Sequence, residues 1–348
     1  MSRLASRPFA PILSLLILAP FTVDILFGAT QVTTMAGLIP EIITYGCAAL
    51  LIRGVVRSCG GGWSTILLFG LAFTVISECL IVQTSLAPQI GRLSNYGRAW
   101  GVNWLYLTWA MGYVSIWGIV LPIQLTELIY PRLRANLWLR RRGLITVAVV
   151  FALGSIGVWC NWTQIVVPKF LHGPSYYPPL FTLAIAIVAA VVLTCAGIWS
   201  LRYRASPGPR TDQGTPPPWQ VALATVVLGV LWCVLELLPS PVDGWVVRFP
   251  PIAPIAVGIA LAVGGLCLLR RWSASSTWSD RHRLAAVTGA LTASMISGFF
   301  VNDLTTPVNL VGKILLNIVA LALLAVLAGN SATKTNRSNR VDFNRSGP

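Results

Sequence analysis

The sequence predicts an all-α integral membrane protein, a bundle of about ten transmembrane helices with both termini on the cytoplasmic side. Three observations support this fold class: the composition, the length of the apolar runs and the placement of the basic residues. Of the 348 residues, 55% are hydrophobic and only 10% are charged, and the mean hydropathy is +0.75. Soluble domains carry about 25% charged residues, so this composition is typical of a membrane protein.

Apolar runs recur along the whole chain. Each is about 20 residues long, which is enough to cross about 30 Å of hydrocarbon as a helix. A helix satisfies all of its backbone polar groups internally, as a lipid-exposed segment requires. In chain order, the predicted spans are residues 9–30, 38–57, 64–84, 101–127, 143–163, 179–201, 219–239, 251–270, 284–302 and 308–329.

The basic residues are concentrated in alternate connections between these spans. With a cytoplasmic N-terminus, 20 of the 25 Lys and Arg residues fall on the inner side, as the positive-inside rule requires in a bacterial cell membrane. The net charge of +15 therefore reflects topology, and no nucleic-acid partner is expected. The inner segment "RLRANLWLRRR" at 132–142 is expected to attract anionic lipid.

The domain organisation is simple. We expect one transmembrane helical domain over residues 1–329 and a disordered basic cytoplasmic tail over 330–348. The inner connection "YRASPGPRTDQGTPPP" at 203–218 is polar and rich in Pro and Gly, which is typical of a flexible linker. The first apolar run carries Asp24 and lacks a small-x-small cleavage site, so we expect a retained helix rather than a signal peptide.

Polar residues of several spans fall at one level, the outer third of the bilayer. Asp24 lies past the middle of the first span, and Glu78 lies in the outer half of the third. Asn103 opens the fourth span, and Lys313, near the start of the tenth, is the only basic residue at that level inside a span. A charge in mid-bilayer costs at least about 2.5 kcal/mol, so such residues are commonly functional.

Two interpretations of this level stay open. The first is a polar cavity open to the outside, which binds a substrate or ion, with Asp24 and Glu78 as its acids, Asn103 beside them and Lys313 as counter-charge. The second is a set of polar clasps between helices. The second is favoured for the carboxylates closest to the interface, which are Glu41, Glu236 and Asp303.

The fourth span places aromatic residues on one face. Tyr106, Ala110, Tyr113 and Trp117 recur at helical spacing, which indicates either a hydrophobic substrate path or ordinary helix packing. At the inner end of the same span, Glu127 lies next to the Arg-rich segment and so has cationic partners within reach.

Small residues also recur at helical spacing. Two stripes, Ala256–Ala260–Gly264 in the eighth span and Gly289–Ala293–Ser297 in the ninth, predict close helix contacts. The ninth span has small side chains on a second face as well, so we expect it to be surrounded by other helices.

The sequence lacks the residues that several kinds of catalytic or metal site require. The two histidines, His172 and His282, are predicted on opposite sides of the membrane, which excludes a His-ligated metal site or a Ser-His-Asp triad. The seven cysteines are scattered, and no Walker A motif is present. We expect no cofactor and no metal site. A catalyst built from carboxylates alone, with or without a divalent ion, stays open.

The first half of the chain resembles a group of uncharacterised bacterial polytopic membrane proteins. The resemblance covers about residues 45–135 and rests on "YGCAALLIRGVVRSCGGGWSTILLFGLAFTVISECL", "YGRAWGVNWLYLTW" and "SIWGIVLPIQLTELIYPRLR". It implies that Glu78, Asn103 and Glu127 sit in recurring surroundings, and it implies no activity. Such proteins often have a second acid beside this glutamate, where this chain has Ser77 and Cys79.

We therefore predict a transporter or permease-like protein with a site at Asp24, Glu78, Asn103 and Lys313. One alternative is a membrane-embedded enzyme that acts on a lipid or prenyl substrate through carboxylates. A second is a non-catalytic subunit or scaffold, whose membrane or cytoplasmic partner would dock on the basic inner loops.

Overall fold

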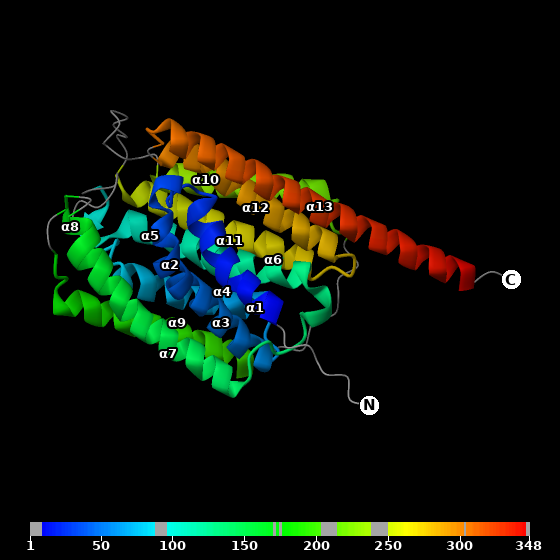
Figure 1. The fold of residues 1–348 in the computed structure, drawn as a ribbon, viewed down its shortest axis with the longest axis horizontal. Helices are drawn as coiled ribbons and strands as arrows, with labels where there is room; N and C mark the ends of the chain where they lie inside the picture. The colour runs from blue at the N-terminus through cyan, green and yellow to red at the C-terminus, as the bar shows by residue number, and fades with distance from the viewer. Residues whose placement is uncertain are drawn as a thin grey trace.

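The computed structural model describes residues 9–87, 96–169, 172–173, 176–202, 214–237, 250–302 and 304–345. Within those residues the chain is almost entirely helical (Figure 1). Eight helices there have the length and apolar composition needed to cross a membrane, and two shorter apolar helices, Phe9–Ile25 and Pro218–Val234, match the first and seventh predicted runs. The protein is therefore a multi-pass, all-α membrane protein. The long spans are Val32–Ser58, Trp63–Ile81, Trp104–Ile129, Arg141–Lys169, Leu180–Arg202, Ile252–Ser273, Asp280–Val301 and Pro307–Asn330.

Some predictions fall on parts of the chain that the structure does not describe. These are residues 1–8, linker residues 203–213, Asp303, the side chain of Glu236 and the end of the tail at 346–348. The backbone of the last helix, α13 (Pro307–Arg345), continues through residues 330–345, which the sequence analysis assigns to the polar tail.

The first half of the chain contains broken spans. Span one is α1 (Phe9–Pro20) with η1 (Phe21–Ile25), and span two is η2 (Val32–Gly37), α2 (Leu38–Glu41), η3 (Ile42–Gly46) and α3 (Cys47–Ser58). Span three is α4 (Trp63–Val75) with η4 (Ile76–Ile81). A hairpin of β1 (Arg98–Ala99) and β2 (Val102–Asn103) leads into span four, which is α5 (Trp104–Tyr113), η5 (Val114–Val120) and α6 (Leu121–Ile129). A short turn, η6 (Pro131–Leu133), precedes span five, which is α7 (Arg141–Asn161), η7 (Trp162–Val166) and α8 (Val167–Lys169).

The second half consists of unbroken α-helices in the described residues. They are α9 (Leu180–Arg202), α10 (Pro218–Leu237), α11 (Ile252–Ser273), α12 (Asp280–Val301) and α13. The contrast with the first half lies in η1, η3, η4, η5 and η7, which are all π-helical segments of five to seven residues. A π-turn inserts one residue into a helix, so it changes which side of the helix the following residues face, and such turns are frequent at functional sites.

The core of the bundle is formed by α1, α4, α5–η5–α6 and α12. Helices α7 and α9 pack on the outside of α3 and α4, α10 and α13 flank α12, and α11 packs on α10 and α5 (Figure 1). Helix α12 has more than half of its central residues buried, so the prediction that the ninth span is surrounded is confirmed. The small stripe of α11 behaves differently, because Ala256, Ala260 and Gly264 are exposed. The prediction of a close contact there is wrong.

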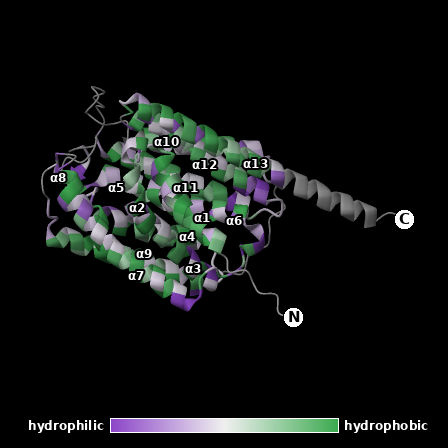
Figure 2. Ribbon diagram, viewed as in Figure 1, coloured by the Kyte–Doolittle hydropathy of each residue, from purple (hydrophilic) through white to green (hydrophobic). Residues whose placement is uncertain are grey.

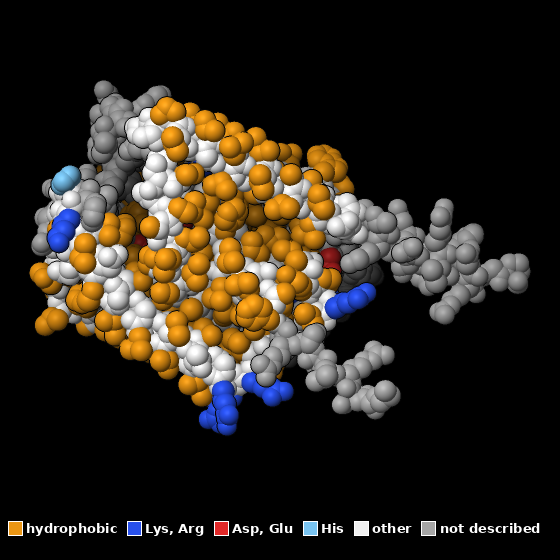
Figure 3. Space-filling model, in the orientation of Figure 1, with side chains coloured by type: hydrophobic (Ala, Val, Ile, Leu, Met, Phe, Trp, Pro, Cys, Tyr) orange, Lys and Arg blue, Asp and Glu red, His pale blue; other side chains and the backbone are white. Residues whose placement is uncertain are grey.

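The surface matches a bilayer environment. Apolar side chains cover the middle of the visible face, and Lys and Arg lie toward its two ends (Figure 3), while the helices are mostly green in the hydropathy view (Figure 2). We call the end of the bundle that holds Arg53, Arg57, Arg134 and Arg283 the arginine end. We call the opposite end, where η1, η4 and α2 lie, the carboxylate end.

Candidate functional site

Three carboxyl groups from three different spans converge at the carboxylate end. Asp24 lies in η1, Glu41 ends α2 immediately before η3, and Glu78 lies in η4. Asp24 interacts electrostatically with both Glu41 and Glu78, and we call these three acids the carboxylate cluster. Because a π-segment carries or adjoins each acid, the local change of helix type decides where each side chain faces.

This cluster is enclosed but not sealed. The Glu78 side chain is only 3% exposed, whereas Asp24 and Glu41 are partly exposed. On the face drawn in Figure 3, acidic atoms are visible inside a recess near the end where α2 and α5 lie. The partial exposure of Asp24 and Glu41 makes the edge of the cluster accessible to water, whereas Glu78 lies behind them in the bundle.

Two tyrosines complete the cluster. Tyr45, in η3, interacts electrostatically with all three acids. Tyr106, in α5, is a hydrogen-bonding neighbour of both Glu78 and Thr84. A phenol can donate to a carboxylate and accept from a cationic ligand, so these rings extend the polar lining beyond the acids.

The cluster is short of hydrogen-bond donors. Thr30 donates to Glu41 Oε1, but Glu41 Oε2 and Glu78 Oε2 are buried and have no hydrogen-bond partner among the described residues. The Asp24 side chain has no ion pair or hydrogen bond to any described residue. Buried polar atoms are nearly always paired in folded proteins. The unused oxygens therefore mark a place where a proton, a cation or a donor group can bind.

Lys313 does not supply that partner. Its ammonium group donates 2.8 Å hydrogen bonds to the carbonyl oxygens of Leu26 and Phe27, and it lies 4.7 Å from the Phe299 ring centroid. These carbonyls follow η1, where the chain turns at Gly28 with φ of +92°. A cation at a helix C-terminus pairs well with its free carbonyls. The structure thus places Lys313 beside the Asp24 helix, where it binds backbone oxygens rather than a carboxylate.

Asn103 lies near the cluster as a structural cap. Its Oδ1 atom accepts from the backbone N–H of Tyr106, which is the N-cap arrangement at the start of α5, and its own N–H donates to Ser85. The hairpin before it turns at Trp100 and Gly101, both with positive φ. Asn103 therefore fixes the start of the helix that carries Tyr106.

An aromatic column continues from this cluster toward the arginine end. Trp109, Tyr113 and Trp117 stack along α5–η5 with centroid spacings of 4.8 Å. The Tyr113 hydroxyl donates to the carbonyl of Val23, and Trp117 Nε1 donates to the carbonyl of Ala290. Tyr113 and Trp117 are buried. Of the two interpretations of this stripe, these contacts favour helix packing.

At the arginine end, Glu127 is paired with two arginines. Its Oε1 atom accepts from Arg53 at 3.0 Å and from Arg57 at 2.9 Å, and its Oε2 accepts from Arg57 at 2.6 Å. The predicted cationic partners are thus present, but they come from α3 rather than from the side chains of the segment 132–142. That segment contributes backbone oxygens, because Arg53 also donates to the carbonyls of Arg134 and Asn136.

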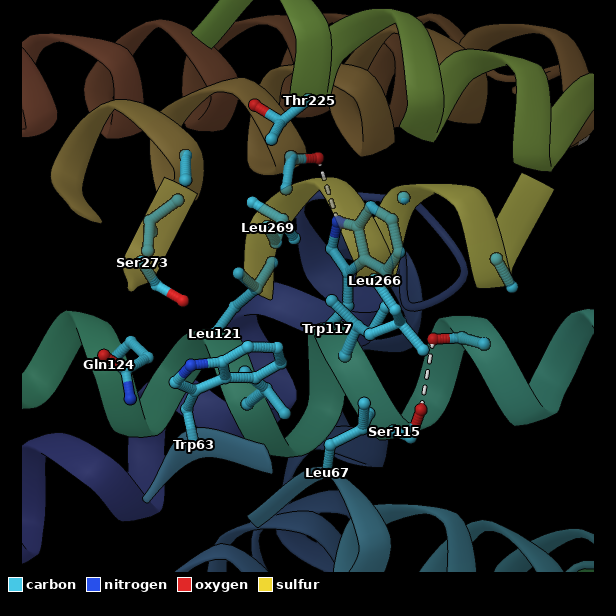
Figure 4. Close-up of a pocket in the computed structure, with 18 of the residues that line it drawn as sticks. Trp63, Leu67, Ser115, Trp117, Leu121, Gln124, Thr225, Leu266, Leu269 and Ser273 are labelled. Carbon is cyan, nitrogen blue, oxygen red and sulfur yellow. Dashed lines mark hydrogen bonds between the residues drawn. The ribbon is translucent and has the colours of Figure 1, made fainter. Parts of the chain in front are cut away.

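A large cavity lies between α4, α5–η5–α6, α10, α11 and α12. Its volume is about 910 Å³, and its lining is mostly aliphatic and aromatic (Figure 4). Leu67, Trp117, Leu121, Leu266 and Leu269 form its apolar walls, and the charged residues that line it lie at the arginine end. The continuous apolar runs of the sequence contain no signal that would place such a cavity.

The site differs in membership from the sequence prediction. Glu41, Tyr45 and Tyr106 belong to it and were not assigned to it from sequence. The sequence predicts only the position of each residue along its span, whereas the direction of each side chain depends on the π-turns. Among the described residues, no group of three His, Cys, Asp or Glu side chains is placed to hold a metal ion. No protein-family model, curated protein or solved structure matches the chain.

Proposed function

We propose that the protein is a transporter or permease-like membrane protein that binds a proton or another cation through one or two of the acids Asp24, Glu41 and Glu78. The observation that carries this proposal is the electrostatic interaction of Asp24 with Glu41 and Glu78 of two other spans, both of which have a buried oxygen without a partner among the described residues. None of the three forms an ion pair with a described Lys or Arg. Three negative charges that interact within a bilayer are costly, and a bound cation or proton would offset that cost.

The proposal includes a topology. Ten spans with both termini in the cytoplasm of a cell membrane would place the arginine end inside, as the positive-inside rule requires. The carboxylate cluster would then lie in the outer half of the bilayer. Helix α1 begins, and α13 ends, on the same side of the bundle in Figure 1, which agrees with an even number of crossings.

Broken helices support transport over a static role. Substrate and ion sites of secondary transporters are commonly built from discontinuous helices, whose irregular turns leave backbone oxygens free for ligands. The π-segments η1, η3 and η4 provide such irregular turns next to the three acids. The same turns give each helix a place where its two halves can change relative orientation.

The alternatives receive less support. An enzyme that uses carboxylates on a lipid would bring an acid to the apolar cavity, but no Asp or Glu is among the described residues that line it. A scaffold would pair Asp24 directly with a neighbouring helix, and its side chain has no such partner in the described part of the chain.

The test is thermal unfolding of detergent-purified protein between pH 5 and 8, in NaCl or in choline chloride. A ligand that binds only the folded state stabilises it by about 2.7 kcal/mol at 100 times its Kd. We expect Na⁺, or a fall in pH, to raise the Tm of the wild type more than that of Glu78→Gln. Asp280→Asn, at the opposite end, is the matched control and is expected to respond like the wild type.

The outcomes separate the possibilities. A sodium-dependent difference identifies a cation site, and a pH-dependent difference without sodium dependence identifies a proton site. If Glu78→Gln and the wild type respond identically to both, the carboxylate site is excluded at Glu78 and the transporter proposal loses its main support.

A further inference from the structure

The large cavity is amphipathic along its length. It reaches from Thr108, in α5, to Gln124, in α6, a rise of about 24 Å at 1.5 Å per residue. Over most of that length its walls are aliphatic side chains and tryptophan rings, as Figure 4 shows for Leu67, Trp117 and Leu266. Pockets of about 300–1,000 Å³ with apolar walls are the usual size for binding a small amphiphile or an acyl chain.

One end of the cavity is cationic. Arg57, Arg134 and Arg283 line that end, together with the glycine turn Gly60–Gly62. The side chains of Arg57, Arg134 and Arg283 remain 19%, 37% and 40% exposed, so each keeps an accessible surface. Arg57 also donates to the carbonyl oxygen of Gly61, whereas Arg134 and Arg283 are the more exposed pair. Two tryptophans flank them, Trp63 and Trp278, the residue type that concentrates where apolar chains meet polar headgroups.

Positive charge at this end exceeds negative charge. Glu127 is shared by Arg53 and Arg57, and Asp280 is shared by Arg134 and Arg283. Four guanidinium groups thus face two carboxylates among the described residues, which leaves two positive charges uncompensated. Arg283 interacts electrostatically with Asp280, Arg134, Glu127 and Arg57, so these groups form one cluster.

One wall of the cavity is a peripheral helix. Helix α11 forms one wall and packs against α5 and α10, while most of its surface faces outward. Toward the arginine end, Leu269 and Ser273 of α11 lie across the cavity from Leu121 and Gln124 of α6 (Figure 4). The cavity therefore occupies the space between α6 and a peripheral helix whose outer surface is apolar and suited to face lipid.

We propose that this cavity binds a membrane lipid with an anionic phosphate headgroup. The acyl chain lies between α4, α6, α10 and α11, and the phosphate lies against Arg57, Arg134 and Arg283. Guanidinium groups bind phosphate oxygens in pairs of parallel hydrogen bonds, and the two uncompensated charges favour an anionic headgroup over a zwitterionic one. The site is at the opposite end of the bundle from Glu78, so it does not depend on the proposed carboxylate function.

The first experiment titrates purified protein in detergent micelles with dioleoyl phosphatidylglycerol or with dioleoyl phosphatidylcholine, and follows the Tm. We expect phosphatidylglycerol to raise the wild-type Tm at a lower mole fraction. Arg283→Gln is expected to need about ten times more phosphatidylglycerol for half of the shift, because it loses one charge-assisted contact. Arg142→Gln, an exposed arginine at the same end that does not line the cavity, is expected to match the wild type.

A second variant tests the apolar part separately. Leu266→Trp enlarges a side chain inside the cavity and leaves the three arginines in place, so it is expected to remove the phosphatidylglycerol response. Native mass spectrometry of the wild type is expected to retain phosphatidylglycerol after delipidation with detergent, and Leu266→Trp is expected to lose it. This variant also decides the question if Arg283→Gln does not fold.

Three results would overturn the proposal. Equal shifts with the two lipids would remove the headgroup preference, and equal loss in Arg142→Gln and Arg283→Gln would indicate general surface attraction. A full shift with sodium phosphate alone would show that the arginines form a site for a free anion rather than for a lipid.

Discussion

The Glu127 carboxylate forms ion pairs with two arginines of another span, Arg53 and Arg57. Arg53 and Glu127 are each only 2% exposed on the side-chain scale, and the Arg53 guanidinium lies 3.2 Å from the Trp138 ring centroid. Removing one member of a buried ion pair leaves an uncompensated charge, which costs about 3–5 kcal/mol. Asp280, with a 43% exposed side chain, also bridges two arginines but does so in contact with solvent.

Glu127→Gln is therefore expected to lower the free energy of unfolding by about 3 kcal/mol, measured as a large fall in Tm in detergent. Asp280→Asn removes the same charge from an exposed pair and is expected to cost less than about 1 kcal/mol. Similar Tm values for the two variants would show that burial does not set the strength of the Glu127 pairs.

Asp24, Glu78 and Lys313 show which features of a single residue can be predicted from the sequence and which cannot. The depth of Asp24 and Glu78 follows from counting along an apolar run, and the structure brings these two acids together. The hydrogen-bond partners of Lys313 could not be predicted from the sequence. They are the carbonyls of Leu26 and Phe27, which become available only because the helix ends at Gly28. Backbone acceptors of that kind leave little trace in composition.

At the scale of elements, α12 approaches the end of span one so closely that no side chain fits between them. A Cβ atom built on Gly298 would lie 1.7 Å from the carbonyl oxygen of Phe27, which is backbone and cannot rotate away. Gly264, in α11, offers a comparison, because a Cβ there would meet nothing within 4 Å.

Gly298→Ala is expected to lower the Tm substantially, since α12 and the turn after η1 would have to separate. Gly264→Ala is expected to leave the Tm unchanged or to raise it, because Ala favours a helix over Gly by about 1 kcal/mol. Circular dichroism melts of the two variants in one detergent are sufficient. Equal stability would contradict the close approach of α12 to span one.

Element type explains which predictions succeeded. The apolar runs identified the spanning helices because continuous hydrophobicity is a strong signal, and the small faces of the ninth span identified α12 as central. The prediction of a close helix contact at the small-residue stripe of α11 was wrong, because small residues permit close packing without requiring it. Gly264 faces open space instead. The π-turns were not predicted, since an extra residue in a helical turn has no distinct composition.

For the whole molecule, orientation in the membrane is the most direct property to measure. Cys59 is exposed in the turn between α3 and α4 at the arginine end, and Tyr177 is 69% exposed at the other end. In a variant that retains Cys59 alone, we expect a membrane-impermeant maleimide to label inside-out vesicles and not right-side-out ones. A second variant with only Tyr177→Cys is expected to give the reverse pattern, and labelling of Cys59 from outside would invert the proposed topology.

The ion pair between α3 and α6 also bears on how the protein is made. Arg53 and Glu127 are separated by 74 residues, so the second span leaves the ribosome well before its counter-charge is synthesised. A helix that carries an unpaired Arg is costly in lipid. We therefore expect span two to stay at the translocon, or at the membrane interface, until span four has emerged. The first four spans would then enter the bilayer as one assembled group, and the later helices would be added to a core in which Arg53 is already paired.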